Sequence, residues 1–469
     1  MLDPIANAQW RVLLRDGRLK MLALATLLLT GIALAGGSAR DARLASERAE
    51  LTAEDAQIWT AQGSVNPHMA AHFGRYISKP VSPLTFFDPG VTDQLGTVAR
   101  LEAHIQQPPR HRPSEGGGAL SRFGGFSPAL ALQLLAPLLV ILAGFSAFSG
   151  DRSRTILRQE LASGAPRRSL LLGRYTALWR AILVILTPIF LVTFVVSIQA
   201  DVQVLSASIA IAAGYLAYLL SWNGITLGVS ALCRSARTSL VILLSIWLLS
   251  TFLVPRFAND VAARLAPTPT AAAFKAEIRA ALEGGPSGHN SSDERLESFK
   301  QATLERYGVE RIEDLPVSWS GLALQEGERI GTEIGNAQYE KLWRSYAQQQ
   351  DIRRYFSVVS PLLALKSWSS GLSRSDASAH VDFVRALEDY RFSFVTLLNE
   401  DIATNAVGQD PWSYKAPDEL LHSIPPFDYT PPAVSDSLRR IWPDGATLAL
   451  WAALAFGIAV FTARRVKPL

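Results

Sequence analysis

Cysteine and charged residues are both scarce in this chain of 469 residues. The single cysteine, Cys233, excludes an internal disulfide framework and any cysteine-based zinc site. Charged residues make up only 18% of the chain, against about 25% in a typical soluble domain, whereas hydrophobic residues make up 49%. The low charge argues against an ordinary soluble enzyme, and the high hydrophobic content argues against a disordered chain. Together they indicate a membrane protein.

Several catalytic and binding motifs are missing as well. A Walker A loop needs a Gly-Lys pair before Ser or Thr to hold phosphates, and none of the eight lysines follows a glycine. The chain is therefore not itself a P-loop ATPase. It has no Gly-x-Ser-x-Gly nucleophile elbow, and no basic stripe with interleaved aromatic residues of the kind that binds nucleic acid. We expect no enzymatic activity of its own, no bound cofactor and no nucleic-acid partner.

Six apolar runs approach the roughly 20 residues that a membrane-spanning helix needs. They cover residues 21–37, 128–149, 175–198, 204–232, 240–254 and 446–463. The first run ends in Ala33-Leu34-Ala35, which resembles a signal-peptide cleavage site. Residues 1–20 before it are long for a signal peptide and have the pattern of an amphipathic helix, so we expect the run to be retained. We predict an all-α membrane protein with six transmembrane helices.

The basic residues predict the orientation of these spans. Residues 1–20, 150–174, 233–239 and 464–469 hold 15 lysines and arginines but only 4 aspartates and glutamates. The remaining segments hold 30 basic and 37 acidic residues. Because short cytoplasmic loops carry an excess of Lys and Arg, we assign the four basic segments, and with them both termini, to the cytoplasm of a bacterial inner membrane.

Two long segments are then expected outside the membrane, residues 38–127 and 256–440. The second carries helical patterns over residues 271–282, 322–350 and 377–405. At roughly 185 residues it is long enough to bury a core of its own. Neither segment has a strand pattern long enough to predict a sheet, so we expect a large extracytoplasmic domain that is helical throughout.

The cytoplasmic segment 150–174 is short and charged, and predicts two helical pieces separated by a break at residues 163–166. A charged helix lying along the membrane suits docking to a soluble partner, whereas simple anchoring of the spans by arginines is the alternative. The residues that we expect to dock are Asp151, Arg152, Thr155, Arg158, Glu160, Arg167 and Arg168.

This segment resembles the cytoplasmic coupling segment of ABC-2 type transporter permeases. Asp151-Arg152 matches the family's acidic-basic pair, Thr155-Ile156 its Thr-Leu, and residues 165–168 its turn, although Arg154 stands where the family usually has glycine and the proline of the turn is shifted. Residues 14–18 are similar to the N-terminal part of the same permeases. A bacterial subfamily that carries a domain of unknown function, DUF3526, is resembled at residues 67–74, 82–84, 101–104, 360–365 and 425–429.

The resemblance implies a permease, most simply an exporter, that pairs with a second copy or a paralogous permease and with two copies of a cytoplasmic ABC ATPase. ATP and Mg²⁺ would bind the ATPase, and the chain itself would contact membrane lipid and a substrate that the sequence does not identify. The alternative is a non-transporting membrane scaffold or sensor whose outer domain binds a peptide or an envelope protein.

Two smaller patterns leave alternatives open. Ser221, Trp222 and Asn223 interrupt the fourth apolar run, so their polar groups face either neighbouring helices or a substrate path. His68 and His72 are spaced to share one face of a helix, as metal ligands would. Two ligands make half a site, and the other five histidines show no shared spacing, so we predict no metal site and leave open whether this pair binds metal.

Overall fold

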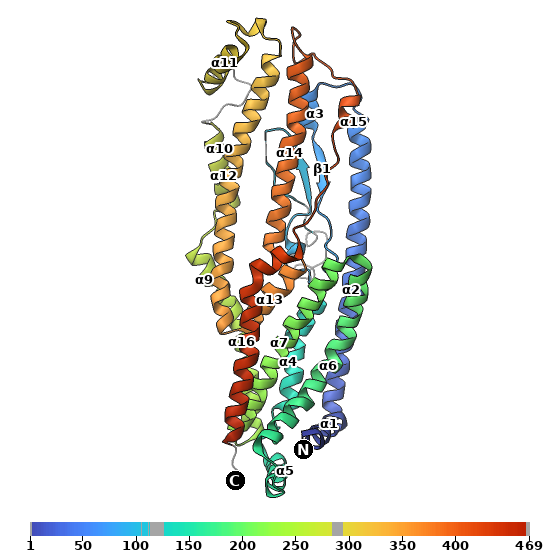
Figure 1. The fold of residues 1–469 in the computed structure, drawn as a ribbon, viewed down its shortest axis with the longest axis vertical. Coiled ribbons are helices and arrows are strands. Elements are labelled where there is room, and N and C mark those ends of the chain that lie inside the picture. Colours follow the sequence, from blue (N-terminus) through green and yellow to red (C-terminus); the bar gives the residue numbers. More distant parts are fainter. Residues whose placement is uncertain (1, 105, 111, 113–125, 284–293, 466–469) are drawn as a thin grey trace.

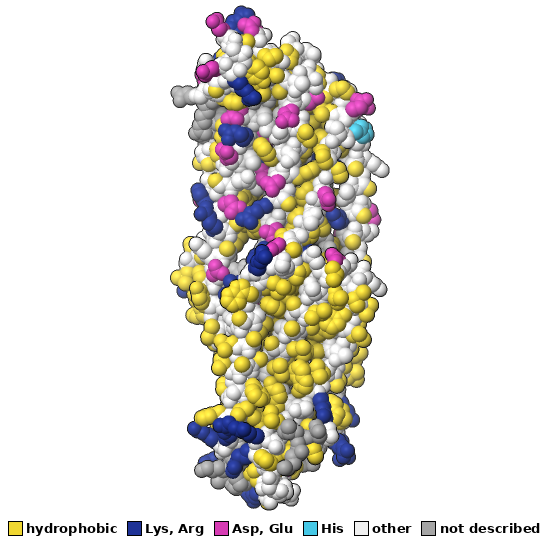
Figure 2. Space-filling view, viewed as in Figure 1, with side chains coloured by type: hydrophobic (Ala, Val, Ile, Leu, Met, Phe, Trp, Pro, Cys, Tyr) yellow, Lys and Arg dark blue, Asp and Glu magenta, His cyan; other side chains and the backbone are white. Residues whose placement is uncertain are grey.

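The molecule is a long helical structure with both chain termini at one end (Figure 1). The computed structural model describes residues 2–104, 106–110, 112, 126–283 and 294–465, and 77% of the chain is helical. Helix α1 (Leu2–Arg15) lies at the same end as the last residues of α16 (Val434–Arg464). We call this end the basic end, because Lys and Arg side chains gather there (Figure 2).

Five helical stretches are long and apolar enough to cross a membrane. They are the α2 stretch Leu19–Thr60, α6 (Arg167–Ala200), α7 (Val202–Leu232), the continuous stretch Ala236–Leu265, and α16. Their number and composition indicate a multi-pass membrane protein. A further apolar helix, α4 (Pro128–Gly144), has only 17 residues, so it is about 25 Å long and shorter than the roughly 30 Å hydrocarbon core. The arrangement of six spans therefore stays a prediction.

Several of these helices continue well past their apolar runs. Helix α2 (Gly17–Thr60) has 44 residues, which gives a length of about 66 Å, twice the hydrocarbon thickness. Its second half is rich in Ala, Glu and Arg, which favour helix. It reaches the half of the molecule farther from the basic end, which we call the outer part (Figure 1). The stretch Ala236–Leu265 consists of α8 (Ala236–Leu248), a π-helical turn (Leu249–Leu253) and α9 (Val254–Leu265).

Helix α7 lies at the centre of the membrane part and packs against α4, α6 and α16. Its contact with α16 is close because of Gly224. A Cβ atom at this position would lie 2.4 Å from the backbone carbonyl carbon of Ala455, a distance that real side chains do not reach. Small residues of this kind let helix backbones approach in the absence of a hydrophobic driving force between helices.

We expect Gly224→Ala to push α16 away from α7 and to lower stability by about 1–3 kcal/mol, as overpacking does. The matched control is Gly457→Ala on α16, because a Cβ atom there meets no atom within 4 Å. Thermal unfolding of the detergent-purified protein measures both. An equal melting temperature for the two variants would contradict the close-packing account.

The outer part is built around two long helices, α12 (Trp319–Tyr355) and α14 (Ala377–Asn405), which pack against each other. The helix predicted over residues 377–405 is α14. Its apolar face forms a second core, separate from the membrane part, with Trp59 of α2 and Leu421 of α15 (Glu419–Ser423). Further helices of this region include α10 (Ala271–Glu283), α11 (Glu294–Tyr307) and α13 (Pro361–Leu372).

The outer part also contains a small sheet, so the prediction that it is helical throughout is wrong. Strand β1 (Arg75–Ser78) pairs antiparallel with β2 (Val98–Leu101), with Arg75 opposite Leu101. The short helix α3 (Pro67–Phe73) precedes β1. The strand sequences, Arg-Tyr-Ile-Ser and Val-Ala-Arg-Leu, do not alternate apolar and polar residues, which is the pattern that predicts a strand. The fold is mostly α-helical rather than all-α.

The surface divides along the long axis. Figure 2 shows apolar side chains covering the half of the molecule that contains the membrane helices, Lys and Arg at the basic end, and acidic side chains in the outer half. An apolar surface of this kind, seen on the face in Figure 2, is what a membrane protein presents to lipid. This surface ends where the polar outer part begins.

Candidate functional site

The segment predicted to couple the chain to a partner forms helix α5 (Asp151–Ala162) at the basic end (Figure 1). Leu157 is buried and anchors the helix to the membrane core, whereas Thr155 and Arg158 are exposed. The side chains of Asp151 and Arg152 lie outside the described residues. One face of α5 is therefore held by the protein and another is open to a partner.

Glu160, one of the residues predicted to dock, forms an ion pair within the chain. Its Oε2 atom lies 2.8 Å from Nη2 of Arg174 on α6. Arg174 is only 3% exposed, and its Nε atom donates a hydrogen bond to the carbonyl oxygen of Ala147, just after α4. Its guanidinium also lies 4.6 Å from the centre of the Phe148 ring. Arg174 thus joins α5, α6 and the end of α4. The sequence alone does not reveal this role, because nothing in the segment marks Arg174 as buried.

Arg167 and Arg168 form the first turn of α6 and are exposed. Two positive charges at a helix N-terminus oppose the helix dipole, so helix stability does not account for them. They line a shallow groove of about 230 Å³ together with residues of α16, including Phe456 and Arg464. This groove faces the basic end and suits an anionic group.

Ser221, Trp222 and Asn223, the candidate substrate path, are all buried in helix packing. The Ser221 hydroxyl donates to the carbonyl oxygen of Ala217 one turn earlier, at 2.8 Å, and Nδ2 of Asn223 donates to the carbonyl oxygen of Tyr175 on α6, at 3.2 Å. These bonds satisfy the Ser221 hydroxyl and the Asn223 amide nitrogen, whereas the Asn223 amide oxygen is buried without a hydrogen-bond partner among the described residues. The choice between helix packing and a substrate path therefore stays open.

A charged cavity of about 460 Å³ lies instead where the membrane helices meet the outer part. We call it the junction cavity. Its charged lining consists of Asp88, Asp93, Arg353, Arg354, Lys366, Asp376 and Asp444. Its uncharged lining includes Ser127, which caps α4, Gln133 of α4 and Ser367 of α13. Sequence reasoning did not find this site, because its charges come from four separate stretches of the chain.

Burial shifts the pKa of several charged groups of the junction cavity. Burial raises the pKa of Asp88, against hydrogen bonds from Ser369 and the backbone of Gly90. Burial likewise raises the pKa of Asp376 and lowers the pKa of Lys366, which the charge of Asp88 partly offsets. Perturbed charges in a cleft are typical of functional sites. Charges of both signs that have lost water can bind a polar or zwitterionic ligand.

Burial of Asp88 makes its carboxylate a source of instability, so Asp88→Asn should stabilise the protein at pH 7. Because the pKa of Asp88 is higher in the folded than in the unfolded protein, the free energy of unfolding falls as pH rises from the unfolded-state pKa to the folded-state pKa. At a pH above both pKa values the loss is complete. We expect a gain of about 1 kcal/mol, measured by thermal unfolding. Asp93→Asn should have the opposite sign, because Asp93 pairs with Arg40 at 3.1 Å. A lower melting temperature for Asp88→Asn would contradict the conclusion that the buried Asp88 carboxylate destabilises the protein.

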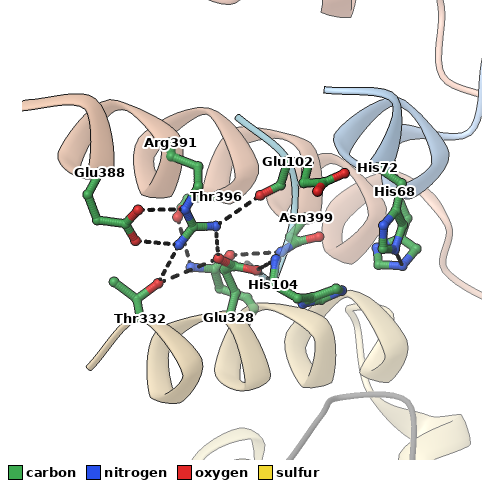
Figure 3. A network of polar contacts seen from close by, with 11 residues as sticks. His68, His72, Glu102, His104, Glu328, Thr332, Glu388, Arg391, Thr396 and Asn399 are labelled. Carbon is green, nitrogen blue, oxygen red and sulfur yellow. Dashed lines mark hydrogen bonds and ion pairs between the residues drawn. The ribbon is translucent and has the colours of Figure 1, made fainter. Parts of the chain in front are cut away.

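A buried polar network joins α12 to α14 in the outer part (Figure 3). Arg391 of α14 is ion-paired with Glu328 of α12 and, at 2.6 Å, with Glu388 of its own helix. Its Nη2 atom also donates to the hydroxyl of Thr332, at 2.8 Å. Burial disfavours the charged form of Glu328, but the hydrogen bond from His104 and the charge of Arg391 outweigh it and lower the pKa of Glu328 to about 2.

Replacing Arg391 by methionine would leave Glu328 and Glu388 buried without their cation. We expect the free energy of unfolding to fall by about 3–5 kcal/mol, the usual cost of breaking a buried pair. The control is Arg385→Met on the same helix, where the pair with Glu340 is half-exposed and is worth about 0–1 kcal/mol. Chemical denaturation of both variants measures the difference, and equal losses would show that burial does not decide the effect.

In a comparison with known protein families, one part of the chain matches a family model. Residues 271–430, from α10 to just before α16, match the model of a domain of unknown function, DUF3526. The DUF3526 part of the resemblance is therefore confirmed over the second outer segment. No curated protein and no solved structure matches the chain.

Proposed function

We propose that the chain is the permease subunit of an ABC-2 type exporter in the bacterial inner membrane, with both termini in the cytoplasm. The observation that carries this proposal is α5, a short charged helix at the basic end that is joined by one partly buried ion pair to the first third of a membrane helix. A partner that binds α5 can move α6 through this pair.

The charge distribution supports the orientation. The basic end holds α1, α5, the α7–α8 connection and the last turn of α16, whose basic residues outnumber the acidic ones. Figure 2 shows the same asymmetry on the molecular surface. Lys and Arg in short connections favour the cytoplasmic side, which is where two copies of an ATPase would reach α5.

A series of contacts connects α5 to the junction cavity, so a movement of α5 can change the cavity. Arg174 links α5 and α6 to Ala147 and Phe148, which follow α4 directly. The opposite end of α4 contributes Ser127, Ala129, Leu130 and Gln133 to the cavity. A second connection runs from Gln133, whose Nε2 atom donates to the Tyr215 hydroxyl of α7 at 3.1 Å. ATP binding by the partner would favour one arrangement of these helices over the other, which is a population shift.

The junction cavity is the substrate site in this proposal. Its volume falls within the range of small-molecule sites, roughly 300–1,000 Å³. Its lining carries carboxylates, arginines and a lysine, which favour a polar substrate with both charges over an apolar one. A second permease, as a second copy or a paralogue, would complete the path.

The test is complex formation with a candidate ABC ATPase from the same organism, and the ATP turnover of the complex. Arg158→Glu and Arg168→Glu reverse exposed charges on α5 and at the start of α6. We expect each to weaken the complex at least tenfold, about 1.4 kcal/mol, with a matching loss of ATP turnover. The control is Arg11→Glu, an exposed arginine of α1 at the same end of the molecule.

Wild-type affinity and turnover in Arg158→Glu and Arg168→Glu would overturn the docking role. Failure of the wild-type chain to bind any ATPase, together with capture of a peptide or envelope protein by its outer part, would replace the permease by a membrane scaffold or sensor.

A further inference from the structure

Three histidines that are distant in the sequence meet in the outer part of the molecule. His68 and His72 belong to α3, and His104 follows β2. One ring nitrogen from each lies within 4.8 Å of the other two. We call these residues the histidine cluster. Figure 3 shows His68 and His72 together on α3, beside the polar network that contains His104 and Glu328.

The local fold builds this meeting from several constraints. Asn66 caps α3 by accepting hydrogen bonds from the backbone N–H groups of His68 and Met69, so the helix begins where both histidines share one face. Gly74 ends α3 with φ of 72°, and a Cβ atom there would lie 2.3 Å from the carbonyl oxygen of Leu101. Glycine therefore lets the end of α3 approach the end of β2. The N–H of Ala103 then donates to the carbonyl oxygen of Ala71, at 3.0 Å.

His104 is held in an orientation that suits a metal ligand. Its Nδ1 atom lies 3.1 Å from Oε2 of Glu328, and the same carboxylate oxygen accepts a hydrogen bond from the His104 backbone N–H, at 2.8 Å. His104 has a backbone φ of 66°, a value that residues other than glycine rarely adopt. Two bonds to one buried carboxylate hold this backbone. A carboxylate on Nδ1 fixes the tautomer that leaves Nε2 as a ligand, as in carboxylate–histidine–zinc sites.

The spacing of the other two rings also fits. The Nε2 atoms of His68 and His72 lie 3.1 Å apart. Neighbouring nitrogens in a tetrahedral zinc site lie about 3.3–3.4 Å apart, because Zn–N bonds are about 2.0–2.1 Å long. The His104 nitrogen lies within 4.8 Å of both, so a small side-chain adjustment would bring all three nitrogens to the spacing of a zinc site. His68 is buried, whereas His72 and His104 are half-buried, so the cluster is open on one side.

We propose that His68, His72 and His104 form a three-histidine site for a divalent transition metal that prefers imidazole ligands, with Zn²⁺ as the physiological ion. Three neutral imidazoles suit zinc, and the open side leaves a fourth position for water or a ligand. Glu328 is a positioning residue that acts through His104. The metal would fasten α3 to the turn after β2 and, through Glu328, to α12. This inference is independent of the transport proposal.

The test is zinc binding by the full-length chain, purified in detergent with an affinity tag that contains no histidine. The protein is stripped with a chelator, dialysed against Zn²⁺ and measured for bound metal, and Co²⁺ reports the geometry through its visible absorption. We expect one Zn²⁺ per chain and a tetrahedral cobalt spectrum. His72→Ala and His104→Gln should each weaken binding by more than tenfold, and Glu328→Gln by about 10–100-fold.

His422→Ala is the matched control, because His422 is an exposed histidine of α15 outside the cluster. It should bind Zn²⁺ as the wild type does. Thermal unfolding without metal identifies which cluster variants are folded, and His72→Ala and His104→Gln change half-buried positions on different elements, so one folded variant is enough. Absence of stoichiometric Zn²⁺ on the wild type, or unchanged affinity in the folded cluster variants, would overturn the site.

Discussion

The packing of α7 against α16 is the contact on which the rest of the structure depends. Helix α7 is surrounded by α4, α6, α13 and α16, and α16 is the helix by which the outer part returns to the membrane part. Gly224 and Gly228 bring the two backbones together. At the outer end of the same bundle, Trp368 of α13 fits over Gly214 and Gly445 and donates from Nε1 to the carbonyl oxygen of Ala210 at 2.8 Å. Small residues thus determine where the outer part sits on the bundle.

In the outer part, buried ion pairs hold the helices together, whereas apolar packing does so in the membrane part. In the membrane part the Ser221 hydroxyl and the Asn223 amide nitrogen donate to neighbouring carbonyl oxygens. In the outer part Arg391, Glu328 and Glu388 are nearly inaccessible to solvent, so α12 and α14 are held in one relative register by ion pairs that tolerate little displacement. The same carboxylate of Glu328 orients His104. The ion pair with Arg391 and the candidate metal ligand His104 therefore depend on the same carboxylate, that of Glu328.

The junction cavity and α5 lie toward opposite ends of the membrane helices, and α4 connects them. The short length of α4 has a consequence for both. Because the helix ends at Gly144, the chain can turn at residues 145–149 and place Ala147 against Arg174. Because it begins at Pro128, its first turns line the cavity rather than lipid. A helix too short to span a bilayer by itself suits a position inside a bundle, surrounded by other helices.

The sequence by itself determined the membrane class, the location of the apolar helices, the long helix over residues 377–405 and the basic character of one end. These properties are local: each depends on composition or on a periodicity within one segment. Two four-residue strands escaped detection because their sequences do not alternate apolar and polar residues. Only the tertiary structure decided that Glu160 pairs with Arg174, that Asp88, Lys366, Asp376 and Asp444 share one cavity, and that His104 joins His68 and His72. Those residues are separated by up to several hundred positions, and their chemistry arises from burial and proximity, which folding creates and local sequence does not encode.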